Sequence, residues 1–124
     1  MQLKLIRFGE NGSEKPGVID ANGTIRDVSS LVADYSPETL SPALIAKLSQ
    51  ADLSALPAAR EGVRIGAPVS RIGHFIAVGL NYADHAAETG APIPSEPVVF
   101  SKAPSCLSGP NDDVMLPKGS VKTD

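Results

Sequence analysis

The sequence predicts a mostly β chain of the α+β class, built from short strands with a few short helices. Eleven prolines and eleven glycines in 124 residues break the chain into short pieces joined by turns. The first residues, 2–8, alternate polar and apolar side chains with the period of a half-buried strand. Aromatic residues make up only 4% of the chain, so its core is expected to consist mainly of Leu, Ile, Val and Ala.

The first thirty residues predict an antiparallel meander of three strands. Strands are expected at Gln2–Phe8, Pro16–Ile19 and Thr24–Asp27. The last two are joined through Asn22-Gly23, a strong hairpin signal because both residues accept a positive φ. We interpret this sheet as structural, because its polar residues are scattered surface charges.

Helices are expected next, because a serine followed by proline often begins a helix. Ser41-Pro42 predicts a helix from Pro42 to about Gln50. Short helices are also expected after Ser29 or Ser30, around 31–33, and after Ser36-Pro37. The apolar residues that share one face of the main helix are expected in the core, with a partner surface as the open alternative: Leu44, Ile45 and Leu48.

The second half of the chain carries further short apolar runs. Strands are expected at Val63–Ile65, His74–Val78, Val98–Lys102 and Val114–Leu116. Residues 66–69 contain glycine and proline and mark the entry to a second part. We therefore expect two domains, residues 1–70 and 71–124.

Composition excludes several classes of function. The net charge of −3 and the lack of a basic run argue against nucleic-acid binding. No apolar segment is long enough to span a bilayer, and no signal-peptide pattern is present, so a cytoplasmic location is expected. Cys106 is the single cysteine, which makes an intrachain disulfide impossible and fits a small buried residue better than a nucleophile.

The most informative stretch is 75–88, where a buried strand is followed by a helical turn. His85 and Glu88 are three residues apart, so one turn of helix places them on the same face. A histidine oriented by a carboxylate can accept or donate a proton near neutral pH. The pair is either a catalytic acid–base pair or two solvated residues on a short surface helix.

The same stretch resembles the fumarylacetoacetate hydrolase family. The family pattern is Gly-x-Asn-Tyr, then His-x-x-Glu, then a Pro-Val-x-Phe-x-Lys strand, and residues 79–88 and 97–102 match it in order. Residues 109–113 and 117–120 match later motifs of the family. The resemblance implies that 71–124 supplies the opening strands of the family's β-roll catalytic domain, preceded by a variable amino-terminal domain.

The resemblance also implies roles for individual residues. His85 and Glu88 correspond to a catalytic dyad on a lid that orders over the substrate. Gly79, Leu80 and Asn81 would shape the substrate pocket. Lys102 would bind a carboxylate or enolate oxygen, its alternative being an ordinary surface cation. The adjacent aspartates Asp112-Asp113 are expected to form a turn, because the family's metal ligands lie elsewhere.

The implied enzyme is a metal-dependent hydrolase or lyase that acts on small 2-oxo or diketo acids by C–C bond hydrolysis, decarboxylation, hydration or isomerisation. Family members use Mg²⁺ or Mn²⁺ to bind the 2-oxo acid and stabilise an enolate. The Glu-x-Glu metal motif is expected just after Lys122-Thr123-Asp124, where this chain stops. We therefore expect no metal ligand and no cofactor within the 124 residues, and no activity of the chain alone.

Two other interpretations stay open. The chain is a non-catalytic structural or oligomerisation fragment, or a separate chain supplies the metal ligands. Whichever interpretation holds, the three short strands of 71–124 would expose apolar residues to water. The expected partners are therefore a second copy, as in a homodimer, or the remainder of the enzyme.

Overall fold

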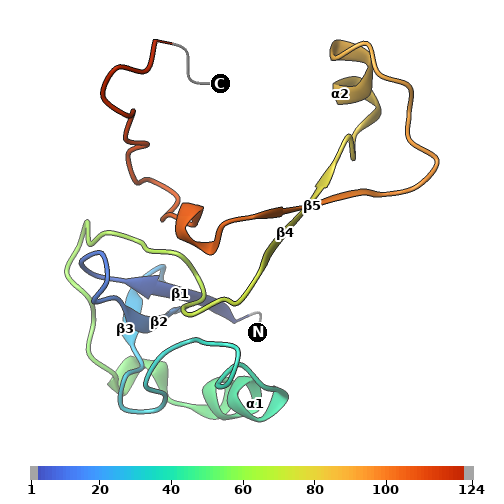
Figure 1. The fold of residues 1–124 in the computed structure, drawn as a ribbon. Helices are drawn as coiled ribbons and strands as arrows, with labels where there is room; N and C mark the ends of the chain where they lie inside the picture. The colour runs from blue at the N-terminus through green and yellow to red at the C-terminus, as the bar shows by residue number, and fades with distance from the viewer. Residues whose placement is uncertain (1–2, 122–124) are drawn as a thin grey trace. The chain divides into compact units, whose positions relative to one another are not determined.

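The computed structural model describes residues 3–121 and confirms a mostly β chain with a few short helices (Figure 1). The chain divides into two compact units. The first comprises Met1–Ser70 and Ser108–Asp124, and the second comprises Arg71–Leu107. The predicted division into domains 1–70 and 71–124 stays a prediction.

The first unit contains a three-stranded antiparallel sheet in the order β1 (Lys4–Phe8), β2 (Lys15–Ile19) and β3 (Ile25–Asp27). The predicted meander is thus present, apart from residue 2, which lies outside the described residues. A side chain at Gly17 would lie 2.8 Å from the Phe8 ring, so glycine lets that ring pack against β2. The turn between β2 and β3 differs from the prediction in one respect: Gly23 has φ +82°, whereas Asn22 does not enter the positive region.

Helix α1 (Pro42–Gln50) forms where the sequence predicts it. Its cap is Ser41, whose hydroxyl accepts a hydrogen bond from the backbone N–H of Leu44 at 3.2 Å. Ile45 is 39% exposed, so its expected place in the core is wrong, because the buried stripe of α1 is only wide enough for Leu44 and Leu48.

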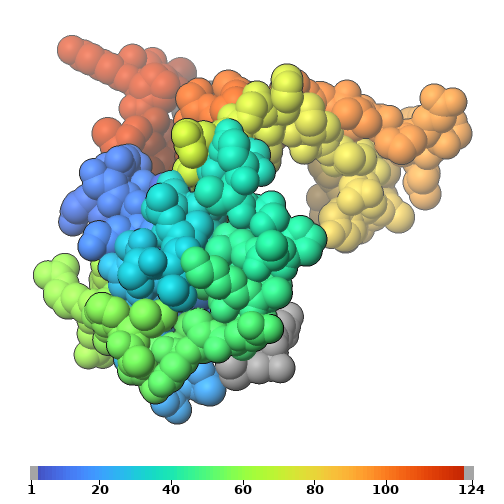
Figure 2. Space-filling view, turned by 90° about the horizontal axis from the view of Figure 1, so that it is seen from below, coloured from blue at the N-terminus to red at the C-terminus, as the bar shows by residue number. Residues whose placement is uncertain are grey.

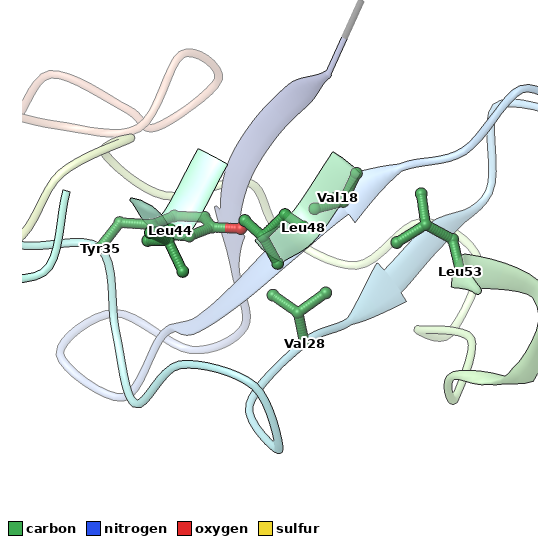
Figure 3. Close-up of a cluster of buried hydrophobic side chains, with 6 residues drawn as sticks. All are labelled: Val18, Val28, Tyr35, Leu44, Leu48 and Leu53. Carbon is green, nitrogen blue, oxygen red and sulfur yellow. The ribbon is translucent and has the colours of Figure 1, made fainter. Parts of the chain in front are cut away.

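The core of the first unit joins the sheet, α1 and the short 3-10 helix η1 (Leu53–Ala55) (Figure 3). In the space-filling view the segments on either side of α1, coloured cyan to green, pack side by side (Figure 2). The buried side chains that form one cluster are Val18, Val28, Tyr35, Leu44, Leu48 and Leu53.

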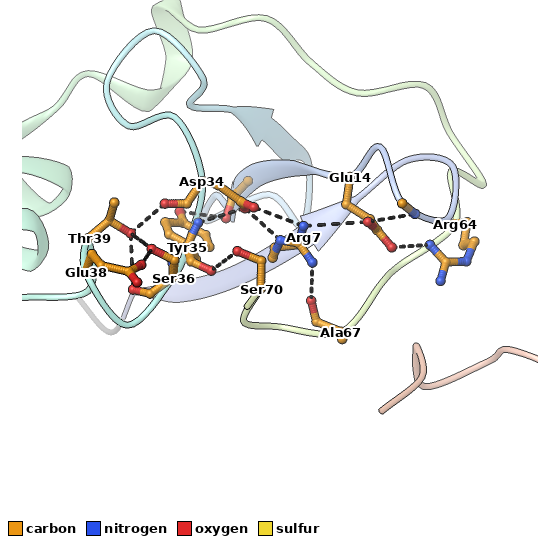
Figure 4. Close-up of polar contacts among 12 residues, drawn as sticks. Arg7, Glu14, Asp34, Tyr35, Ser36, Glu38, Thr39, Arg64, Ala67 and Ser70 are labelled. Atoms are coloured by element: carbon orange, nitrogen blue, oxygen red, sulfur yellow. Dashed lines mark hydrogen bonds and ion pairs between the residues drawn. The ribbon is translucent and has the colours of Figure 1, made fainter. Parts of the chain in front are cut away.

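A polar network borders this core (Figure 4). The Arg7 guanidinium donates to both carboxylate oxygens of Asp34, at 2.7 and 3.0 Å. Tyr35 is fully buried, and its hydroxyl donates to the backbone carbonyl of Gly17 at 3.1 Å. Within the described residues, no buried side-chain nitrogen or oxygen lacks a hydrogen-bond partner, so burial of these charges is compensated.

The second unit is an antiparallel hairpin of β4 (Phe75–Gly79) and β5 (Val98–Lys102), with α2 (Ala83–Glu88) between the strands and the 3-10 helix η2 (Pro104–Cys106) after them. The register places Gly79 opposite Val98 and Phe75 opposite Lys102. Both faces of the hairpin carry exposed apolar side chains: Ile76, Val78, Val98, Val99 and Phe100.

Four predicted elements are wrong. Val114–Leu116 is irregular and exposed, because an apolar run forms a strand only where another strand pairs with it. Val63–Ile65 contributes only a single bridge, between Ile65 and Phe8. The helices expected near residues 31–33 and after Ser36 are isolated turns.

No helix of the described residues is both long and apolar enough to cross a membrane.

Candidate functional site

The candidate site begins at the turn from β4 into α2. Leu80 has φ +48°, in the left-handed region that costs an ordinary side chain free energy, and this bend ends the strand after Gly79. Helix α2 then runs from Ala83 to Glu88, and its inner residue Ala86 is buried. Gly90, with φ +67°, ends the helix as the sequence predicts.

His85 and Glu88 lie three residues apart on α2 and are both exposed. Spacing of this kind places the two side chains on one helical face. Among residues 3–121, neither the imidazole nor the carboxylate has a hydrogen-bond or ion-pair partner. The pair is therefore free to meet a ligand, and the carboxylate is near enough in sequence to orient the ring.

A shallow, open hollow of about 300 Å³ lies next to this turn. Three predicted substrate-binding residues, Gly79, Leu80 and Asn81, line one side of it. The other side is the loop from Ile93 to Val98, which adds the polar residues Ser95 and Glu96 to the lining. Sequence reasoning missed these two polar groups, although they lie in the segment just before the matched Pro-Val-x-Phe-x-Lys strand.

The hollow is lined by residues 78–81 and 93–98, so His85, Glu88 and Lys102 are outside its lining. Lys102 lies at the opposite end of β5, and four strand residues correspond to about 13 Å. Its ammonium nitrogen is 5.8 Å from the centre of the Phe100 ring, a cation–π distance. The structure therefore groups Gly79, Leu80 and Asn81 but does not bring Lys102 to them.

The residues present do not fit the divalent metal that the resemblance implies. Within the described part of the chain, no three side chains of His, Cys, Asp or Glu come together in a way that could hold a metal ion. Lys122, Thr123 and Asp124, after which the metal motif is expected, lie outside the described residues. Asp112 and Asp113 form no metal site: Asp112 bonds to Arg64 and to the N–H of Gly109, as expected for a turn residue.

Cys106 is exposed on η2, so its expected burial is wrong. The 3-10 turn after Pro104 projects it to solvent.

Comparison with known proteins supports the family resemblance. Residues 74–124 match the model of the family described as fumarylacetoacetate (FAA) hydrolase C-terminal. A protein named "Putative hydrolase" from Burkholderia ambifaria is 55% identical over 122 residues, which are 98% of this chain and 43% of that protein. A relative of the same name from Burkholderia multivorans has the same identity and coverage. The chain thus spans less than half the length of these relatives.

A solved structure resembles the chain as well. The fumarylacetoacetate hydrolase from psychrophilic Exiguobacterium antarcticum superposes with a TM-score of 0.54 and 33% sequence identity, over 84% of this chain and 36% of that one. The likeness extends beyond residues 74–124 into the amino-terminal sheet, since it covers most of the chain. The comparisons therefore confirm the predicted resemblance of this chain to the fumarylacetoacetate hydrolase family, with residues 74–124 as the segment that the family model matches.

Proposed function

We propose that the chain is part of a hydrolase or lyase that acts on small 2-oxo or diketo acids. The observation that carries this proposal is the order of groups after β4: Gly79, Leu80 and Asn81 line a hollow, and α2 follows with His85 and Glu88 on one face. A binding surface followed at once by an acid–base pair suits a reaction in which a proton moves to or from a small bound acid.

In this proposal His85 accepts a proton from water or substrate, and Glu88 orients the ring and stabilises its charged form. Asn81 offers an amide that both donates and accepts hydrogen bonds, which suits a carbonyl or carboxylate oxygen. Because His85 and Glu88 do not line the hollow, α2 must move toward it when substrate binds.

The second candidate is a non-catalytic association module, and the observation that favours it is the exposure of both faces of the β4–β5 hairpin. Ile76 and Val99 are 55% and 60% exposed. Exposed apolar strands of this kind usually mark a surface that another protein segment or subunit covers. In this alternative the expected partner is a second copy or the remaining part of the enzyme. A cytoplasmic location fits both candidates.

The test uses a fusion of this chain to the remaining length of the Burkholderia ambifaria relative. The fusion is assayed with Mg²⁺ or Mn²⁺ against acylpyruvates and other 2-oxo acids, by the loss of substrate absorbance. His85→Ala and Glu88→Gln are expected to lower kcat by about 10²–10⁴. The matched control is His74→Ala, because His74 is the other histidine and is exposed just before β4.

Activity that survives His85→Ala at the level of His74→Ala would contradict the catalytic role. Inactivity of the unmodified fusion on every substrate would favour the association module. Sedimentation of the same fusion then shows what covers the hairpin, because a dimer is expected if a second copy covers it and a monomer if the remaining part of the enzyme does.

A further inference from the structure

We propose that Arg64 and Asp112 act as a clamp that holds together the two chain ends of the Arg71–Leu107 unit and thereby stabilises the β4–β5 hairpin. In this proposal both are positioning residues, and neither touches a substrate. The clamp does not depend on the proposed chemistry, because the contacts of Arg64 and Asp112 all lie within the first unit.

Arg64 is held by the first sheet before it meets Asp112. Its Nη1 donates to the Glu14 carboxylate at 2.9 Å and to the Gly9 carbonyl at 3.1 Å. Its own carbonyl accepts from the N–H of Gly9 at 2.9 Å. Glu14 in turn lies 3.6 Å from the Arg7 guanidinium (Figure 4). The two nitrogens left over, Nε and Nη2, are thus oriented before the last partner binds, which lowers the entropic cost of the pair.

Those two nitrogens bind Asp112 in a bidentate arrangement. Nε lies 2.7 Å from Oδ1 and Nη2 lies 2.6 Å from Oδ2. This fork geometry is the strongest form of an arginine–carboxylate pair. The two residues are 48 positions apart in sequence, so the contact joins segments on either side of the Arg71–Leu107 unit.

The turn of residues 109–112 holds the Asp112 carboxylate in position for this contact. The Oδ2 atom of Asp112 also accepts the N–H of Gly109 at 2.7 Å, and the Asp112 N–H donates to the Gly109 carbonyl at 3.3 Å. Pro110 occupies the second position of the turn, where its fixed φ is favoured. Gly109 is buried, and a Cβ there would collide with the carbonyl oxygen of Ile65. Only glycine therefore lets this turn approach residue 65.

The outgoing end of the chain is fixed beside this turn. Gly66 donates its N–H to the Arg7 carbonyl at 2.8 Å, and Ser70 donates both its N–H and its hydroxyl to the Tyr35 carbonyl, at 2.8 and 3.0 Å. Pro68 and Ser108 line the same apolar hollow of about 290 Å³. The chain thus leaves the first unit and returns to it at neighbouring places.

Holding the segments before residue 71 and after residue 107 together favours formation of the β4–β5 hairpin. β4 begins at Phe75 and β5 ends at Lys102, and these residues are opposite each other in the register. A two-stranded hairpin with two exposed faces is marginal by itself. Holding its two ends together removes part of the entropic cost of closing the loop. The clamp therefore favours the pairing of β4 with β5 without touching either strand.

The test is amide hydrogen exchange of the chain, comparing Asp112→Asn with Asp113→Asn. Asp113 is the matched control, because it is the adjacent exposed aspartate and has no side-chain partner among the described residues. In Asp112→Asn we expect exchange on the order of tenfold faster at the amides of residues 109 and 112, and several-fold faster at the paired amides of β4 and β5. Asp113→Asn is expected to leave both sets unchanged.

Faster exchange at the turn with unchanged exchange in the hairpin would overturn the proposal and leave a purely local ion pair. An equal effect of Asp113→Asn would overturn it as well. The amides of α1 report whether Asp112→Asn remains folded. Should it unfold, Arg64→Lys and Asp112→Glu decide, because both keep the charge and weaken the fork. The proposal then requires that both variants accelerate amide exchange in the β4–β5 hairpin.

Discussion

Arg7 and Asp34 form a bidentate pair at the edge of the core, with Nε 2.7 Å from Oδ1 and Nη2 3.0 Å from Oδ2. The pair joins β1 to the loop that carries Tyr35, whose backbone N–H also donates to Asp34 at 2.8 Å. Arg7 is only 7% exposed. Its charge therefore depends on Asp34, on Glu14 and on the Ala67 carbonyl for compensation.

Asp34→Asn is expected to lower the free energy of unfolding by about 1–3 kcal/mol, because a buried guanidinium loses its main charged partner. Urea denaturation followed by circular dichroism measures the change. Asp113→Asn is the control and should stay within about 0.5 kcal/mol of the unmodified chain. Equal stabilities of the two variants would show that Arg7 finds adequate compensation elsewhere.

The first unit is expected to lose stability in acid. Burial alone would raise the pKa of Asp34, but hydrogen bonds from the Arg7 guanidinium and the Tyr35 backbone N–H, together with the charge of Arg7, outweigh it and hold the pKa below the ordinary value of 3.8. The hydrogen bond from Arg64, followed by that from Gly109, lowers the pKa of Asp112 in the same direction. Groups with a lowered pKa in the folded state contribute stability above their unfolded pKa, and that stability is lost as the pH falls through the folded pKa.

The urea midpoint should therefore stay level from pH 7 to about pH 5 and fall toward pH 3. In Asp34→Asn the decline below about pH 4 should be smaller, because one of the titrating groups is gone. A midpoint that is the same at pH 5 and pH 3 would contradict this linkage.

Leu80 is expected to tolerate asparagine better than valine. Its φ of +48° is accessible to asparagine, whereas a β-branched side chain is strongly disfavoured there. Leu80→Val should destabilise the turn by about 1 kcal/mol or more relative to Leu80→Asn. Amide exchange at the paired residues of β4 and β5 measures the difference, and Ile76→Val in the extended strand is the control. Similar exchange in the two Leu80 variants would mean that the turn adjusts its backbone.

Residues 82–94 are expected to exchange their amide hydrogens rapidly in the free chain. Within this segment of the described residues, Ala86 is the only buried side chain, so little apolar contact holds it in place. Slow exchange across His85 to Glu88, comparable with that of α1, would contradict the expected mobility. It would also count against the movement of α2 that the proposed function requires.

The chain is expected to show no saturable binding of Mg²⁺ or Mn²⁺ in calorimetry. The reason is that residues 3–121 gather no set of three metal-binding side chains. Hard divalent ions need several oxygen ligands at once. A one-site isotherm in the micromolar range would contradict this expectation, because it would mean that metal-binding side chains come together in solution although they lie apart in the structure.

Local signals predict much of this fold. Helix α1 and strand β5 have the predicted bounds, because Ser41-Pro42 is a strong start signal and Val98–Lys102 follows a rigid proline. The strand predicted at Val114–Leu116 is wrong because local signals do not determine strand pairing. Its residues are β-prone, but no strand lies beside them among the described residues. The contact between Arg64 and Asp112 could not be predicted from the sequence either, because no local signal indicates a contact between residues 48 positions apart.

The candidate site divides in the same way. The sequence indicates Gly79, Leu80 and Asn81, and the structure brings them to one hollow because they are consecutive. Lys102 follows them by more than twenty positions, and only the antiparallel register reveals that it lies at the other end of the hairpin. The roles of all six predicted site residues, in catalysis or in substrate binding, stay predictions.

The discontinuous first unit determines how a nick in the chain would behave. A protease that cuts the exposed loop between α2 and β5 separates two pieces in sequence but not in space. The β4–β5 ladder and the arginine fork at residue 64 still join the pieces. Such material would give two bands on a denaturing gel and elute as one species under native conditions. The 108–112 segment, which the sequence analysis places in the second expected domain, would then purify with the amino-terminal sheet.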